Sequence, residues 1–141
     1  PYGASVHFAS MISEKVGIIT TDDYGICCEE RKALHYQFAG RIAAVEKVEM
    51  TVLDLCEGDL LARLTACCQR LEAQQIYAVV LGCTGMNFAA DELKTALKKA
   101  GLQIQVIEPL KTGVKALELL IKMEYTNAIK GTKVRMEDYI E

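Results

Sequence analysis

Four apolar segments alternate with amphipathic ones along the chain, and this pattern predicts the order of its elements. Strands are expected at the apolar segments, which are residues 15–21 (KVGIITT), 48–55 (VEMTVLDL), 77–82 (YAVVLG) and 102–107 (LQIQVI). Helices are expected where apolar side chains recur at helical spacing, in residues 1–13, 22–39, 59–75, 88–100 and 109–123. Each predicted strand is therefore followed by a helix.

Residues typical of helix ends support several of these boundaries. Asp22 or Asp23 can cap the helix over residues 22–39, whose buried side is expected to include Ile26, Leu34 and Phe38. Gly101 follows the helix over residues 88–100, and Pro109 suits the first turn of the last helix.

Strands joined through helices form parallel sheets covered on both faces. The sequence thus predicts an α/β fold, a three-layer sandwich with a four-stranded parallel sheet. We expect one such lobe over residues 1–123 and a polar C-terminal tail over residues 124–141. A chain of 141 residues is long enough for one real core.

Composition narrows the function classes. Hydrophobic residues make up 51% of the chain and charged residues 25%, as in ordinary globular proteins. A formal net charge of −3 and the lack of a basic run argue against a nucleic-acid partner. No apolar stretch approaches a membrane span, and the first residues lack the features of a secretory signal. A cytoplasmic protein with no membrane partner is expected.

Six cysteines are present without a metal-binding or disulfide pattern. They are Cys27, Cys28, Cys56, Cys67, Cys68 and Cys83, with no C-x-x-C and no histidine at zinc-like spacing. Reduced thiols are expected, most of them core residues, and no metal or other cofactor is predicted.

Cys83 differs from the others because it directly follows a predicted buried strand. Ligands of open α/β sheets bind at the carboxyl ends of the strands, where a neighbouring helix N-terminus also favours a thiolate. Gly82 and Gly85 would allow a ligand to approach the backbone closely. The N–H groups of Thr84, Gly85 and Met86 can then cradle an anion. The alternative is that Cys83 only fills space in a tight turn. A phosphatase loop is excluded, since the arginine required six residues later is Ala89.

Other polar residues are expected at the same sheet edge. Thr20 and Thr21 end the first strand, either as hydroxyl donors to a ligand or as helix caps. Glu108 ends the fourth strand and is expected to begin a helix. A cysteine hydrolase or transferase would need a histidine near Cys83, and neither His7 nor His35 is obviously placed to serve.

The sequence resembles the aspartate/glutamate racemase superfamily, and its hydantoin and allantoin racemases in particular. The resemblance runs from about residue 3 to residue 122. Its most specific part is LGCTGM, residues 81–86, and a VIE stretch leading into a VKALE helix, residues 106–108 and 114–118, adds to it. Leu117 interrupts the usual form of that helix.

The resemblance implies a cofactor-independent racemase with two α/β lobes and one cysteine from each lobe. A racemase must remove a proton from one face of a carbon and return one to the other, so acid and base must both reach it. Cys83 would be the second-lobe acid/base, and Thr20, Thr21, Thr84 and Gly85 would hold the oxygens of a small amino-acid or hydantoin-like substrate.

This sequence resembles only the second lobe, and no other cysteine takes the place of the first-lobe one. Cys56 follows a predicted strand but lacks the glycine-rich turn. The alternative is a non-catalytic lobe acting as a small-anion-binding or interaction module. Without the first lobe, apolar side chains of the last helix would be uncovered, so a homo-oligomer or a pairing with a first-lobe chain is expected. These side chains are Val114, Leu117, Leu120 and Ile121.

Overall fold

The computed structural model describes residues 1–56 and 58–125. Its sheet contains four strands, all parallel, in the order β2-β1-β3-β4. Their bounds are Val16–Thr20 for β1, Ile42–Lys47 for β2, Ala78–Leu81 for β3 and Gln105–Ile107 for β4. Register is set by the pairs Ile19–Leu81 and Val80–Ile107, which bring the carboxyl ends of the strands to one edge.

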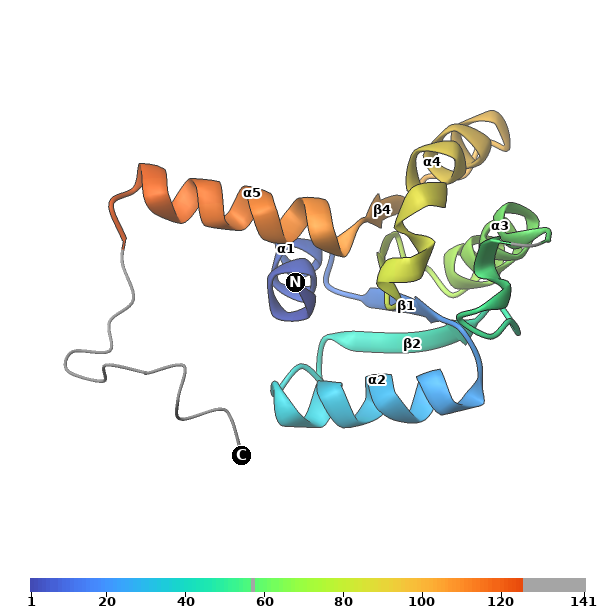
Figure 1. Cartoon of the computed structure of the whole chain (residues 1–141), viewed down its shortest axis with the longest axis horizontal. Helices are drawn as coiled ribbons and strands as arrows, with labels where there is room; N and C mark the ends of the chain where they lie inside the picture. Colours follow the sequence, from blue (N-terminus) through green and yellow to red (C-terminus); the bar gives the residue numbers. More distant parts are fainter. Residues whose placement is uncertain (57, 126–141) are drawn as a thin grey trace.

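Helices cover both faces of this sheet (Figure 1). The helices are α1 (Tyr2–Ile12), α2 (Asp23–His35), α3 (Leu60–Ala73), α4 (Ala90–Lys99) and α5 (Pro109–Lys122), with short 3₁₀ helices η1 (Asp54–Cys56) and η2 (Thr84–Ala89). On one face, α3 and α4 form the larger core with Ile19, Val79 and Leu81. On the other, α1 lies over Ile18, Ala78 and Val80. The predicted α/β sandwich with four parallel strands is confirmed.

The second strand lies earlier in the chain than predicted. It is formed by residues 42–47, whereas residues 48–55 form a loop that ends in η1. β2 is an edge strand whose side chains are mostly half-buried, so its sequence, IAAVEK, lacks a strong apolar signal. The chain leaves the sheet after Lys47, and Glu49 adopts a positive φ of 57°.

The helix α2 is shorter than predicted, and its buried face is different. It ends at His35, and Gln37 then adopts a positive φ of 60°. Leu34 is 70% exposed, Phe38 is buried but lies after the helix, and the buried residues of α2 are Glu29 and Ala33. Helical periodicity alone did not distinguish the face that meets the sheet from the face that meets solvent.

The helix ends follow the expected chemistry. Asp22 is the N-cap of α2 and accepts a hydrogen bond from the Gly25 N–H at 2.8 Å. Glu108 caps α5 by accepting from the N–H groups of Leu110 and Lys111 at 2.7 and 2.8 Å. Gly101, with a φ of +74°, follows the end of α4.

The cysteines divide into buried and exposed groups, so their assignment to the core was only partly right. All six are free thiols; Cys67 and Cys68 are buried, whereas Cys27 and Cys56 are exposed. Burial raises the pKa of Cys67 to about 11 and that of Cys68 to about 12. Cys56 lies in η1 rather than directly after a strand.

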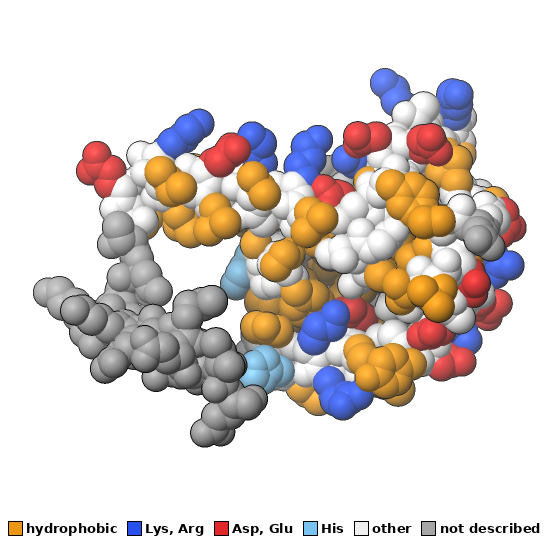
Figure 2. Space-filling view, in the orientation of Figure 1, with side chains coloured by type: hydrophobic (Ala, Val, Ile, Leu, Met, Phe, Trp, Pro, Cys, Tyr) orange, Lys and Arg blue, Asp and Glu red, His pale blue; other side chains and the backbone are white. Residues whose placement is uncertain are grey.

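The helix α5 extends away from the sheet and packs mainly on α1 (Figure 1). Figure 2 shows hydrophobic side chains along one side of α5 and lysines along the other. Val114, Leu117 and Ile121 are exposed, Ile121 by 73%. Most of the predicted tail lies outside the described residues. No helix within the described ranges is long and apolar enough to cross a membrane.

Candidate functional site

Cys83 stands at the carboxyl edge of the sheet, between the end of β3 and the start of η2. Its backbone is extended, with φ −110° and ψ 126°, and its half-buried side chain packs against the α3/α4 core. The Gly82 N–H donates to the Ile19 carbonyl at 2.7 Å, which holds this turn against the end of β1. The turn is thus a fixed continuation of the sheet.

The two glycines beside Cys83 are required by close packing. A Cβ on Gly82 would lie 2.9 Å from Oε1 of Glu29 and 3.1 Å from the Ile19 carbonyl oxygen. A Cβ on Gly85 would lie 2.9 Å from Cδ1 of Leu55 and 3.4 Å from Sγ of Cys83. Both contacts at Gly82, and the contact with Leu55 at Gly85, are tighter than a real Cβ normally makes, so glycine is favoured at both positions.

Backbone donors are present at the turn, although fewer than predicted. The first N–H groups of a helix have no acceptor within it, which leaves those of Thr84 and Gly85 available to a ligand. The Met86 N–H donates to the Cys83 carbonyl at 3.1 Å. The prediction that Met86 contributes a free N–H was therefore wrong.

Thr20 and Thr21 lie next to this turn, since Ile19 pairs with Leu81 across the two central strands. Both threonines are almost completely buried, at 3% and 5% exposure. Asp22, rather than either threonine, supplies the side chain that caps α2. The backbones of the five predicted residues, Thr20, Thr21, Cys83, Thr84 and Gly85, therefore meet at one sheet edge. The hydroxyls of Thr20 and Thr21 face α2: both lie against Gly25, and the Thr21 hydroxyl donates to Oδ1 of Asp22 at 3.4 Å.

Glu29 of α2 lies against the same turn and was missed in the sequence. It is 2% exposed, forms an ion pair with Lys32, and leaves Oε2 buried without a hydrogen bond. Burial raises the pKa of Glu29, and Lys32 partly offsets this. A Glu and a Lys three residues apart in a helix are typical of a solvent-exposed pair, so the burial of Glu29 could not be predicted from this pattern.

Glu29 and Cys83 lie on opposite faces of the sheet. Glu29 contacts Gly82 on the face of Ile18, together with Tyr2, whose buried hydroxyl also lacks a partner. Burial, with Glu29 contributing, raises the pKa of Tyr2. Glu29 thus supports the strand end from behind, away from the Cys83 thiol.

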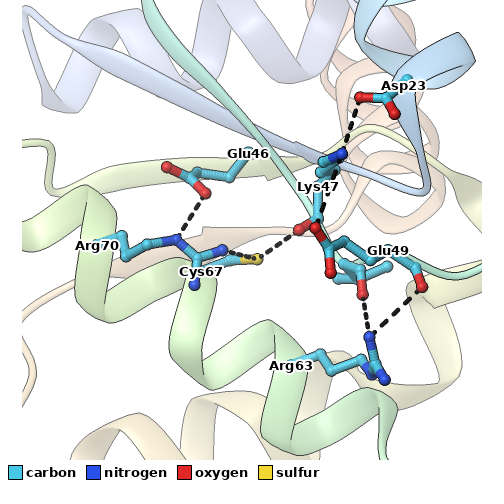
Figure 3. Close-up of polar contacts among 8 residues, drawn as sticks. Asp23, Glu46, Lys47, Glu49, Arg63, Cys67 and Arg70 are labelled. Carbon is cyan, nitrogen blue, oxygen red and sulfur yellow. Dashed lines mark hydrogen bonds and ion pairs between the residues drawn. The ribbon is translucent and has the colours of Figure 1, made fainter.

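A second polar cluster joins β2 to α3 (Figure 3). Arg70 bonds Glu46 at 2.8 Å and Sγ of Cys67 at 3.2 Å, and Cys67 in turn donates to the Lys47 carbonyl at 3.3 Å. Arg63 donates to the Val48 carbonyl at 3.0 Å. These contacts fasten the edge strand to its helix, and the protonated, buried Cys67 thiol is structural.

Cys83 does not lie in any of five surface hollows, which measure 210 to 480 Å³ and are lined by other residues. It stands instead on the open sheet edge. Within residues 1–56 and 58–125, no group of His, Cys, Asp or Glu side chains is arranged to hold a metal ion.

Comparison with known families gives this arrangement its context. The family model for Asp/Glu/hydantoin racemases matches residues 2–117. The chain belongs to this family. A search of curated proteins found no significant match.

Solved racemase structures share the fold. Allantoin racemase from Klebsiella pneumoniae matches with 26% identity and a TM-score of 0.74, over 92% of this chain and 57% of that one. Allantoin racemase from Pseudomonas fluorescens matches with 20% identity and a TM-score of 0.74, over 92% and 54%. Glutamate racemase from Francisella tularensis, in complex with D-glutamate, matches with 18% identity and a TM-score of 0.51, over 91% and 49%. The chain thus spans about half the length of these racemases.

Proposed function

We propose that this chain supplies one half of a cofactor-independent racemase site, with Cys83 as one of two thiol acid/bases. The substrate class is an amino acid or a hydantoin-type derivative. The observation that supports this most strongly is the position of Cys83 in a chain of the racemase family. Cys83 follows a central strand, in the turn next to the backbone of Thr20 and Thr21, at the edge where parallel sheets bind ligands.

The chemistry of racemisation explains why this arrangement is suited to the task. A thiolate at Cys83 removes the proton from the substrate carbon, and negative charge then grows on the adjacent carbonyl or carboxylate oxygen. The N–H groups of Thr84 and Gly85 can stabilise that charge, and Thr20 and Thr21 would contribute once their hydroxyls turn from α2 toward the substrate. A second thiol on the opposite side of the carbon completes inversion.

We propose that the second thiol comes from a first-lobe chain or segment that packs against the exposed side of α5. Alternatively, a second copy of this chain packs against the same side of α5 and supplies its own thiol. Val114, Leu117 and Ile121 present an exposed apolar surface of the kind that partners cover. Sedimentation should show an assembly that Leu117→Ser weakens; a stable monomer at tens of micromolar would contradict self-association.

A non-catalytic binding module is the second candidate function. The observation that favours it is the open position of Cys83, which lies in none of the five surface hollows. Such a module would hold a small anion at the Cys83 turn without moving a proton.

Proton exchange on the chiral carbon separates the two functions. A chiral 5-substituted hydantoin and a chiral amino acid are incubated in D₂O with the protein and with Cys83→Ser. Because this chain carries one of the two thiols, the racemase proposal predicts exchange of the proton on the chiral carbon that Cys83→Ser abolishes, and loss of rotation in an assembly that supplies the second thiol. Binding of the compound without any Cys83-dependent exchange would favour the module.

A further inference from the structure

The loop after β2 lies beside the candidate site and shapes it. The Val48 N–H donates to the Thr20 carbonyl at 3.0 Å, and the Met50 N–H donates to the Thr21 carbonyl at 3.1 Å. In Figure 1 this loop belongs to the green stretch between β2 and α3. Residues 48–56 therefore follow the same sheet edge as Cys83.

Two hydrogen bonds between Thr51 and Asp54 close a tight turn in this loop. The Thr51 hydroxyl donates to Oδ2 of Asp54 at 2.6 Å, and the Asp54 N–H donates to the Thr51 carbonyl at 3.2 Å. Leu55, only 2% exposed, anchors the turn in the core beside Gly85. The backbone between these anchors is therefore held beside the candidate site.

Two of those side chains are apolar and project into solvent. Val52 is 58% exposed and Leu53 is 88% exposed. Val52 and Cys83 both lie close to Gly85. A Cβ placed on Gly85 would lie 4.0 Å from Cγ1 of Val52 and 3.4 Å from Sγ of Cys83. Exposed apolar side chains are common on protein surfaces, but these two lie on a fixed turn next to the thiol.

On the described segments around the loop, charged side chains pair with nearby groups. Asp22 accepts from the Gly25 N–H, Asp54 accepts from Thr51, and Lys47 bonds Asp23 at 2.8 Å and pairs with Glu49 at 3.7 Å. A charged substituent of a ligand on this side of Cys83 would thus meet methyl groups rather than a counter-ion, at a cost in desolvation.

We propose that Val52 and Leu53, the apolar wall of the site, determine substrate specificity. The wall favours substrates whose reacting carbon bears an uncharged apolar group, and it disfavours those bearing a carboxylate. This inference rests on the proposed function for the location of the substrate. It names Val52 as the specificity-determining residue nearest the thiol.

The test is protection of Cys83 from iodoacetamide, read at the level of its peptide by mass spectrometry. The ligands are 5-isobutylhydantoin and hydantoin-5-acetic acid, whose substituents have nearly the same shape but differ in charge. The isobutyl compound is expected to protect at a concentration about tenfold lower or better. Val52→Lys should abolish or reverse this preference, because it places a cation on the wall. Leu34→Lys, an equal change at an exposed position at the far end of α2, should leave it unchanged.

Equal protection by the two compounds, or by neither, would overturn the proposal. A preference that Val52→Lys leaves intact, or that Leu34→Lys removes equally, would also overturn it. The outcome is distinguishable from that of the racemase proposal, because protection requires binding but no turnover. Selective protection without Cys83-dependent proton exchange would contradict the catalytic function and still support the apolar wall.

Discussion

Gly82→Ala is predicted to destabilise the protein, because the added methyl group has no room. It would lie 2.9 Å from Oε1 of Glu29, 3.0 Å from Cγ2 of Ile18 and 3.1 Å from the Ile19 carbonyl oxygen. The carbonyl belongs to a central strand and the carboxylate is buried in an ion pair, so neither neighbour moves freely. Overpacking of this kind costs about 1–3 kcal/mol. For a domain of this size the melting temperature should fall by about 4–12 °C.

Thermal unfolding followed by circular dichroism measures this effect, with Gly3→Ala as the matched control. A Cβ on Gly3 of α1 meets nothing within 4 Å, so that change should be neutral or stabilise the helix by up to about 1 kcal/mol. The cost of Gly82→Ala should decrease in a Glu29→Ala background, since one of the three contacts is then removed. A Gly82→Ala protein that melts within 1 °C of the wild type would refute the packing argument.

Three further predictions follow from burial and backbone geometry. Glu29→Gln should stabilise the protein relative to wild type more at pH 7 than at pH 4. Burial raises the folded-state pKa of Glu29 above its ordinary 4.5, so the contribution of Glu29 to stability is fully present below pH 4.5 and is lost as pH rises through the folded-state pKa. Urea titrations at both pH values test this, and a pH-independent difference would contradict it. In the native protein at pH 8, iodoacetamide should modify exposed Cys56 at least about a hundredfold faster than Cys67, whose pKa of about 11 leaves little thiolate; peptide mass spectrometry measures both, and similar rates would show that Cys67 is accessible. Gly101→Ala should cost about 1 kcal/mol, because its φ of +74° is unfavourable for a residue with a Cβ, and an unchanged melting temperature would argue against that backbone conformation.

The strands β1 and β3 could be predicted from sequence because their burial is complete and continuous. Every residue of both strands is buried, and a run of apolar residues bounded by glycine reports this directly. The caps of α2 and α5 could be predicted equally well, since Asp22 and Glu108 accept hydrogen bonds from residues two or three positions away. Local chemistry and complete burial leave clear marks in a sequence.

Features that depend on tertiary packing could not be predicted from the sequence in the same way. The edge strand β2 is only half-buried, whereas the apolar Val52 and Leu53 that suggested a strand point into solvent. Glu29 resembles a surface residue until α2 is placed against Gly82. The same limit applies to the candidate site. Cys83 and the two threonines were proposed from their places at strand ends, but the loop beside them was predicted as a strand.

The central claim is that the Cys83 thiolate removes a proton from the carbon of a bound substrate. Exchange of the C5 proton of a chiral 5-substituted hydantoin for deuterium, followed by NMR in D₂O, tests this most directly because one base is sufficient for exchange on one face. The account predicts exchange above the buffer rate in the wild type, and exchange at the buffer rate in Cys83→Ser. Equal rates for the two proteins would contradict it.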